Sequence, residues 1–224
     1  TVLQFQYDRY AIIGVEMGAS HVSVVRTDLA GVIQASESAV HDLRRDPSGG
    51  LERTHQLVES LVKSASQTVI GLGVGVPTPL HSETPGRLSA RVLPGWKDID
   101  LRAALESRHG LRLRIENDAN LGALAEHWWG EGREVTDFTY VKVSTGVGAG
   151  FIIGGDIYRG AGGIAGELGH THIDIGSSPS QVNDVLGSEA LIQMARVAAQ
   201  ELDSWPAWLS DDLDIPGLVD AACS

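Results

Sequence analysis

Two structural patterns meet where Leu111-Arg112-Leu113-Arg114-Ile115 is followed directly by Glu116-Asn117-Asp118-Ala119-Asn120. Apolar and basic residues alternate over residues 111–115, which predicts a half-buried strand, and residues 119–129 predict a helix. We therefore expect an α/β arrangement in which Asp118 stands at the start of a helix, beside backbone amides that favour a carboxylate.

Asp118 can serve chemistry as well as structure at this position. A carboxylate at a helix start can accept hydrogen bonds from sugar hydroxyls, or take a proton from one as a general base. The simpler alternative is that Asn117 or Asp118 only caps the helix, and residues 116–120 alone favour it. The glycine-rich segments 144–150 and 166–170 shift the balance toward a ligand pocket.

The residues before this junction predict a first α/β unit. Strands are expected at residues 2–5, 10–15, 22–26, 32–36 and 68–76, and helices at 51–65 and 101–108. The first two strands would form a hairpin through Asp8-Arg9, and residues 28–31 would form a turn. A meander followed by helix, strand, helix and strand resembles an actin-like (ribonuclease H-like) half-domain.

The residues after the junction predict a second, similar unit. Strands are expected at 138–143, 148–153 and 156–159, with turns at 145–146 and 154–155, and a last clear helix at 188–202. A repeated architecture with a cleft between two domains follows, divided as 1–118 and 119–224. Residues 216–220 begin a helix that is cut off, so we expect the native polypeptide to continue.

Composition excludes several functions. The net charge of -12 and the lack of a Lys/Arg run leave no electrostatic footprint for nucleic acid in this chain. Cys223 is the only cysteine, which excludes an internal disulfide framework and a thiolate zinc cluster. No apolar run suits a membrane span and the N-terminus does not resemble a signal peptide, so we expect a cytoplasmic protein without a membrane partner.

Two glycine-rich segments are candidate ligand loops. Gly146, Gly148 and Gly150 let the backbone approach a ligand, and the amides there could hold a phosphate, although the same glycines could equally form a tight hairpin. Glu167 and His170 follow the small residues 160–166 and could present an acceptor and a ring nitrogen to one ligand. The alternative for that pair is an ion pair on a helix, which the preceding glycines disfavour.

Five motifs in order make the chain resemble the ROK family of repressors, open reading frames and sugar kinases. They are Gly75-Val76-Pro77, Leu93-Pro94-Gly95-Trp96, residues 116–120, residues 144–150 and residues 166–170, within a resemblance that runs from about Ala11 to Val219. The resemblance implies a two-domain actin-like sugar kinase fold that closes on a sugar.

The resemblance also implies roles for single residues. Asn117, Asp118, Glu167 and His170 would contact sugar hydroxyls, and in family kinases the aspartate matching Asp118 deprotonates the attacking hydroxyl. The nucleotide phosphates would lie near Ser144, Thr145 and Gly146.

Departures from the family pattern place kinase activity in doubt. Where family kinases carry Asp-x-Gly-Gly-Thr-Lys, this chain has Glu16-Met17-Gly18-Ala19-Ser20-His21, which adds a methyl group at Ala19 and replaces a permanent cation with His21. Glu16 and Gly18 remain as a degenerate phosphate loop. Mg²⁺ and ATP are expected only if the protein is a kinase.

Two further departures concern metal and sugar. Residues 171–187 lack the family's zinc-binding cysteines, so we assign no metal, and His172 alone makes a poor zinc site. Val92 stands where family kinases often have Asn, which indicates an altered pocket.

The extra strand expected before the first phosphate loop, Val2 to Tyr10, resembles the family's repressors. We therefore expect the sugar-sensing effector domain of a transcriptional regulator, a homo-oligomer that contacts DNA through a winged-helix domain outside this chain. The alternative is an ATP-dependent hexose kinase with Asp118 as general base. A third possibility is a scaffold without ligand binding.

Overall fold

A five-stranded sheet with the order β3-β2-β1-β4-β5 forms the first part of the protein. The computed structural model describes residues 4–80, 86–89, 93–174 and 179–200. The strands are β1 (Tyr10–Met17), β2 (His21–Asp28), β3 (Ile33–Val40), β4 (Thr68–Val76) and β5 (Arg112–Asn117). The first three pair antiparallel, whereas β4 lies parallel to β1 and β5 parallel to β4. The carboxyl ends of β1, β4 and β5 therefore lie at the same end of the sheet.

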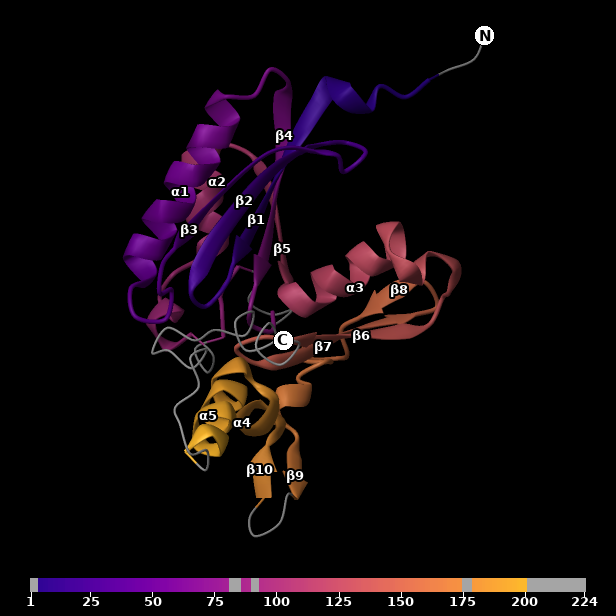
Figure 1. Ribbon diagram of the computed structural model, residues 1–224. Helices are drawn as coiled ribbons and strands as arrows, with labels where there is room; N and C mark the ends of the chain where they lie inside the picture. Colours follow the sequence, from indigo (N-terminus) through magenta and orange to yellow (C-terminus); the bar gives the residue numbers. More distant parts are fainter. Residues whose placement is uncertain (1–3, 81–85, 90–92, 175–178, 201–224) are drawn as a thin grey trace.

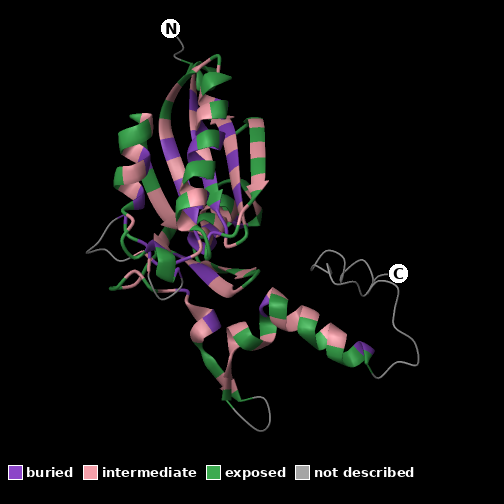
Figure 2. Cartoon of the chain, turned by 90° about the vertical axis from the view of Figure 1, so that its left-hand side faces the viewer, coloured by how far each residue is buried: buried purple, intermediate pink, exposed green. Residues whose placement is uncertain are grey.

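Helices α1 (Pro47–Lys63) and α2 (Leu101–His109) cover one face of this sheet (Figure 1). The main core lies between them and the strands, and Figure 2 shows buried residues alternating along the strands. In β1 every second residue is buried, as expected for a strand with one face against the core: Ala11, Ile13, Val15 and Met17. The short 3-10 helix η2 (Pro94–Trp96) adds Trp96, which is fully buried and donates its indole Nε1–H to the carbonyl oxygen of Leu43 at 2.7 Å.

Helix α3 (Asp118–Trp129) leads from β5 to a second sheet with the order β6-β7-β8. Its strands are β6 (Phe138–Val143), β7 (Val147–Ile153) and β8 (Asp156–Tyr158), all antiparallel. The helix lies directly on β7, because a Cβ at Gly150 would stand 2.5 Å from the carbonyl oxygen of Ala119. A short 3-10 helix, η3 (Glu131–Glu134), follows α3.

The remaining elements extend below the second sheet in Figure 1. They are η4 (Leu168–His170), a hairpin of β9 (His172–Asp174) and β10 (Pro179–Gln181), and helices α4 (Val182–Leu186) and α5 (Ser188–Ala199). No helix among the described residues is long and apolar enough to cross a bilayer.

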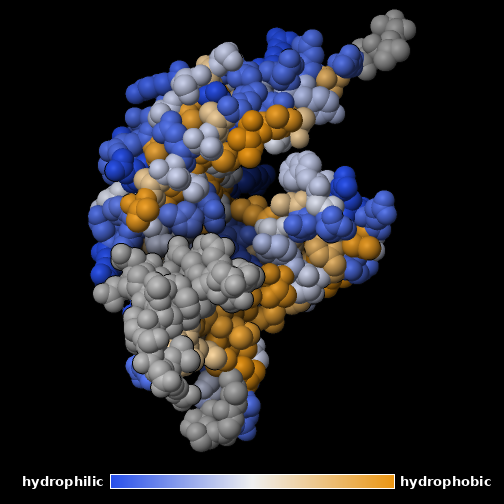
Figure 3. Space-filling view, in the orientation of Figure 1, coloured by the Kyte–Doolittle hydropathy of each residue, from blue (hydrophilic) through white to orange (hydrophobic). Residues whose placement is uncertain are grey.

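The first sheet and helix α3 also meet away from the β5–α3 junction. The turn between β2 and β3 reaches the end of α3, where a side-chain carbon at Gly31 would lie 3.2 Å from Cζ2 of Trp129. In Figure 3 a hollow separates the surface formed by the first sheet from the surface formed by α3.

The expected hairpin at the N-terminus is wrong. Residues 4–6 are not in a strand, Tyr7–Arg9 form the 3-10 helix η1, and residues 2 and 3 lie outside the described part. The physical reason is that β1 is hydrogen-bonded to β2 on one edge and to β4 on the other, which leaves no edge for a third partner. The argument for a repressor that rested on this strand therefore falls away.

Most other expected elements are present with small changes in their bounds. The turn at residues 28–31 is confirmed: Asp28 Oδ1 accepts the amides of Ala30 and Val32, and Gly31 has a φ of 83°. Helix α1 begins four residues before the expected start, because Asp46 caps it by accepting the amide of Gly49 and Pro47 suits the first turn. Val92, Cys223 and the expected helix start at 216–220 lie outside the described residues.

Candidate functional site

The β5–α3 junction carries the central group of the site. Asn117 is the N-cap of α3, because its Oδ1 accepts the amides of Ala119 at 3.0 Å and Asn120 at 3.1 Å. The capping role weighed for Asn117 is therefore present. Its side-chain Nδ2 is a separate group that can donate to a ligand.

Asp118 is the first residue of the helix rather than its cap. Oδ1 accepts the amide of Ala119 at 2.7 Å, and Oδ2 accepts a hydrogen bond from Lys142 Nζ, also at 2.7 Å. The Asp118 side chain is 17% exposed, so the pair is largely shielded from water. Both carboxylate oxygens thus have a donor.

Lys142 reaches this junction from β6 and also approaches the first sheet. Its Nζ lies 3.7 Å from Oε1 of Glu16, near the end of β1. Burial alone would lower the pKa of Lys142, but the hydrogen bond and charge of Asp118 and the charge of Glu16 outweigh it, so the pKa lies above its ordinary value. Lys142 is therefore a charged ammonium group held between two carboxylates.

Glu16 and Gly18, which we expected to belong to a degenerate phosphate loop, lie beside His21 where β1 ends and β2 begins. Nε2 of His21 lies 3.6 Å from Oε2 of Glu16, and a Cβ at Gly18 would stand 2.5 Å from Cε1 of the ring. The imidazole therefore lies over Gly18, where a phosphate-binding loop needs an open backbone. His21 therefore lies beside Oε2 of Glu16, and Lys142 lies beside Oε1.

Glu116 organises the other side of the junction. Its Oε2 accepts hydrogen bonds from Arg159 Nη2 at 2.6 Å and Nε at 2.9 Å, and its Oε1 accepts from Asn120 Nδ2 at 2.9 Å. Arg159 follows β8, so this ion pair ties the second sheet to the end of β5. These contacts fix the backbone on which Asn117 and Asp118 stand.

Glu167 and His170 form a second group beside β7. His170 Nε2 lies 3.7 Å from Glu167 Oε2, and Nδ1 lies 3.2 Å from Oε1 of Gln181. Glu167 and His170 therefore lie within ion-pair distance of each other, in the helical spacing that we had disfavoured. This spacing arises because η4 is a 3-10 helix, which aligns residues three apart without needing the longer helix that the glycines exclude.

β7 connects this second group with the junction. Gly166 has a φ of 95° and its carbonyl oxygen accepts the amide of Ala149 at 2.8 Å, so the chain before Glu167 lies against β7. The neighbouring Gly150 touches Ala119 of α3. The two expected halves of the sugar site therefore lie on either side of the same two residues of β7.

The expected phosphate loop at Ser144, Thr145 and Gly146 is the turn between β6 and β7. The Ser144 carbonyl oxygen accepts the amide of Ser188, and Asn183 Oδ1 accepts the amide of Val147 at 2.8 Å. Asn183 also lies 3.3 Å from the position of a Cβ at Gly146. The hairpin that we weighed as the alternative is therefore present, since Val143 pairs with Val147 across this turn, and contacts with α4 and α5 support it. His172, which was not assigned as a ligand, lies exposed on β9.

Sequence reasoning missed Lys142, Arg159 and Asn183, because their partners lie far away in the chain. For Lys142 alone, the strand pattern gave a usable indication of its position. Along β6, Tyr140 and Lys142 are half-buried whereas Thr139, Val141 and Val143 are exposed, so strand alternation places Lys142 on the face that meets α3.

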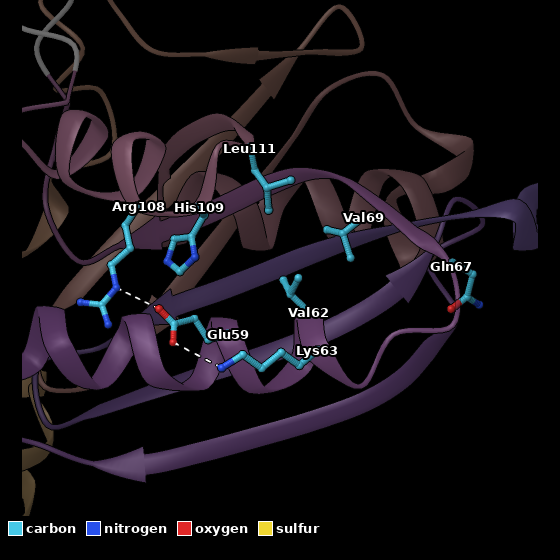
Figure 4. Close-up of a pocket in the computed structure, with 8 residues that line it drawn as sticks. All are labelled: Glu59, Val62, Lys63, Gln67, Val69, Arg108, His109 and Leu111. Carbon is cyan, nitrogen blue, oxygen red and sulfur yellow. Dashed lines mark hydrogen bonds and ion pairs between the residues drawn. The ribbon is translucent and has the colours of Figure 1, made fainter.

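A distinct pocket of about 300 Å³ lies between α1, α2 and the starts of β4 and β5 (Figure 4). It contains ion pairs of Glu59 with Arg108 at 2.9 Å and with Lys63 at 3.9 Å. This pocket is at the end of the parallel strands opposite to Asn117 and Asp118. The Glu59–Arg108 pair joins α1 to α2 and the Glu59–Lys63 pair lies within α1, and we do not assign the ligand site to this pocket.

Next to this pocket, His55 Nδ1 and His109 Nε2 share a hydrogen bond of 2.9 Å. Burial lowers the pKa of both rings, and the nearby positive charge of Arg108 acts in the same direction. Both rings are therefore neutral in the fold at pH 7, and double protonation would leave two N–H groups facing each other.

We expect the free energy of unfolding to fall as the pH drops below about 6.5, where histidines of the unfolded chain take up protons. The folded rings resist protonation, so the stability is complete above that pH and is lost as the pH falls toward the lowered values. Urea titrations between pH 7.5 and 5 would measure the loss. It should shrink in His55→Gln/His109→Gln and persist in the exposed control His172→Gln; equal slopes in all three proteins would refute the assignment.

The fold and site together define a class of protein. The first sheet is built from a meander followed by helix, strand, helix and strand, and the β5–α3 junction with Asp118 connects it to the second sheet. This arrangement is the actin-like α/β fold. The profile of the ROK family matches residues 12–190, and the chain belongs to the ROK family.

Relatives with known names include both repressors and kinases. A xylose repressor of Caldicellulosiruptor bescii is 36% identical over 176 residues, which are 77% of this chain and 44% of the repressor. A glucokinase of Halalkalibacterium halodurans is 32% identical over 179 residues, which are 77% of this chain and 53% of the kinase. The chain spans about half the length of the curated relatives it matches.

Solved structures give the same two kinds of neighbour. A ROK family transcriptional regulator, described as a homolog of the E. coli MLC protein, superposes with a TM-score of 0.76 at 19% identity over 96% of this chain and 56% of its own. A ROK glucokinase from Streptomyces griseus, in complex with glucose and AMPPNP, gives 0.72 at 25% identity over 85% and 61%. The choice between sensing and phosphorylation therefore rests on the site.

Proposed function

We propose that this chain is the sugar-sensing effector domain of a ROK-family transcriptional regulator, a repressor of carbohydrate metabolism. The observation that carries the proposal is the hydrogen bond from Lys142 Nζ to Asp118 Oδ2. Each carboxylate oxygen accepts one hydrogen bond and keeps a further lone pair for a sugar hydroxyl, whereas taking up a proton as a general base would cost Asp118 its charge-assisted hydrogen bond with Lys142. Asp118 then suits hydrogen bonding to a sugar better than proton abstraction.

The phosphate loop supports the same choice. The imidazole of His21 lies over Gly18, and Glu16 is flanked by His21 and Lys142. A Mg²⁺ ion bound through Glu16 would stand beside the Lys142 ammonium group, so these residues do not fit the metal. ATP-dependent transfer lacks both the open backbone and the metal carboxylate that it needs.

Within this proposal the sugar contacts Asn117 Nδ2, Asp118, Glu167 and His170. Amide and carboxylate groups suit neighbouring hydroxyls, which both donate and accept hydrogen bonds. The names of the repressor relatives make D-xylose the first sugar to test. The two domains meet at residues 118 and 119, and the sugar lies between them.

The rest of the regulator is also part of the proposal. A winged-helix domain outside this chain contacts DNA, the whole protein is a cytoplasmic homo-oligomer, and sugar binding favours a closed arrangement that changes the spacing of the DNA-binding domains. The repressor relatives leave room for such a further domain, since each is more than twice as long as the segment it shares with this chain.

The alternative is an ATP-dependent hexose kinase with Asp118 as general base. It is favoured by the position of Asp118 at the start of α3 and by the glucokinase relatives. The two functions differ in one measurement, because a kinase releases ADP in the presence of sugar and ATP.

Calorimetric titration of the full-length protein with D-xylose, D-glucose and N-acetyl-D-glucosamine tests the proposal. We expect heat from at least one sugar, and a dissociation constant raised about 10- to 100-fold in Asp118→Asn, because the amide loses charge-assisted hydrogen bonds worth about 1.5–3 kcal/mol. A coupled assay should detect no ADP release above background. Absence of heat with every sugar, or sugar-dependent ADP release that disappears in Asp118→Asn, would overturn it.

A further inference from the structure

We propose that Lys142 is a positioning residue that couples sugar binding at Asp118 to the position of the first sheet through Glu16. The inference rests on the proposed sugar site and adds to it the route by which occupancy changes the arrangement of the two sheets.

Lys142 is the residue through which three separate parts of the fold meet. Its backbone belongs to β6 of the second sheet, Asp118 begins α3, and Glu16 belongs to β1 of the first sheet. A side chain that holds carboxylates from two other elements transmits a change at one of them to the other.

The two contacts of Lys142 are unequal. The distance of 2.7 Å to Asp118 is that of a short charge-assisted hydrogen bond, whereas 3.7 Å to Glu16 is an ion pair too long for a hydrogen bond. An ammonium group has three donors, so Lys142 can serve both carboxylates at once. An approach of about 1 Å, from 3.7 Å to the usual 2.7–2.9 Å, would complete the second bond.

Partial burial limits how the two contacts of Lys142 can change. The side chains of Lys142 and Asp118 are 26% and 17% exposed, so water cannot freely replace a lost partner, while Glu16 is 48% exposed and has room to move. His21 Nε2 lies 3.6 Å from the other oxygen of Glu16, so Oε1 is the oxygen that faces Lys142.

A sugar hydroxyl that donates to Asp118 Oδ2 competes with Lys142 for the same lone pairs. The weakened ammonium–Asp118 bond is then offset by a closer contact with Glu16, which draws the end of β1 toward β6. The sugar shifts the equilibrium because it makes contacts in the closed arrangement that it lacks in the open one.

A double-mutant cycle in the full-length protein tests the coupling. Glu16→Gln, Lys142→Met and the double variant are titrated with the sugar that gives heat in the wild type, and small-angle scattering measures the radius of gyration with and without it. In the wild-type background Glu16→Gln should raise the dissociation constant about 5-fold and abolish the sugar-induced compaction. In the Lys142→Met background the same change should alter the constant less than about 2-fold.

Two further variants separate positioning from general stability. Lys142→Arg keeps the charge and should restore most of the compaction. Lys63→Met removes another lysine that pairs with a glutamate, at 3.9 Å on α1, and should respond as the wild type does. If Lys142→Met does not fold, Glu16→Gln alone still tests the coupling, because Glu16 is half exposed and its loss should abolish the sugar-induced compaction.

Equal effects of Glu16→Gln in both backgrounds, or normal compaction in Glu16→Gln, would overturn the coupling while leaving the proposed function intact. A wild-type protein that gives no heat with any sugar would overturn the proposed function, and this inference with it.

Discussion

Trp96→Ala is expected to lower the free energy of unfolding by about 3–5 kcal/mol, the cost of removing a large aromatic side chain from a close-packed core. Trp96 is fully buried beside Leu43, Leu93 and Leu101, which are also inaccessible to solvent. Its replacement leaves a cavity that the short helix η2 cannot close, because Pro94 restricts the backbone there. Urea denaturation followed by circular dichroism measures the loss.

Trp96→Phe separates the two contributions of the indole. Phenylalanine keeps most of the apolar volume but removes the Nε1–H that donates to the Leu43 carbonyl oxygen. We expect it to cost about 1–3 kcal/mol, the penalty for leaving a buried acceptor without its donor together with a small cavity. A loss below 1 kcal/mol in Trp96→Ala would show that this motif is not a core element.

Gly166→Ala is expected to damage both stability and sugar binding. Gly166 has a φ of 95°, which L-residues rarely adopt, and an added Cβ would collide with the carbonyl oxygen of Ala149. The segment must then move off β7, and Glu167 and His170 move with it. We expect a loss of about 2–4 kcal/mol in unfolding free energy from strain and overpacking combined, and a dissociation constant for sugar raised at least about 10-fold.

Gly154→Ala is a matched control for this variant. Gly154 also has a positive φ, 62°, but an added Cβ there meets no atom within 4 Å. It should cost about 1 kcal/mol from backbone strain alone and leave sugar affinity unchanged. If the two variants behave alike, the collision with Ala149 has no energetic consequence and the attachment of the segment to β7 is incidental.

The sequence predicted those parts of the fold whose signals are local. Strands β4 and β6 appear at the predicted residues, because β4 is an apolar run ended by Pro77 and β6 consists almost entirely of aromatic and β-branched residues. The strand expected at residues 2–5 failed because its existence depended on a free edge of β1, which is a property of the whole sheet.

The site was predictable to the extent that its residues lie in contiguous motifs. Asn117 and Asp118 stand at the junction where the pattern placed them, and Glu167 and His170 contact each other. The loss of a cation at His21 was readable, but the packing of its ring over Gly18 was not. Lys142 was overlooked because its contact with Asp118 spans 24 residues, and strand periodicity gives only the face of a side chain, never its partner.

The contact between Trp129 and Gly31 has a practical consequence for studying this protein. Gly31 in the β2–β3 turn lies so close to the indole that an added Cβ would be 3.2 Å from Cζ2 of Trp129, yet Trp129 as a whole is 60% exposed. Any rotation of one sheet against the other changes how much water surrounds that ring. Tryptophan emission can therefore serve as an intrinsic optical probe of ligand-driven motion, without chemical labelling.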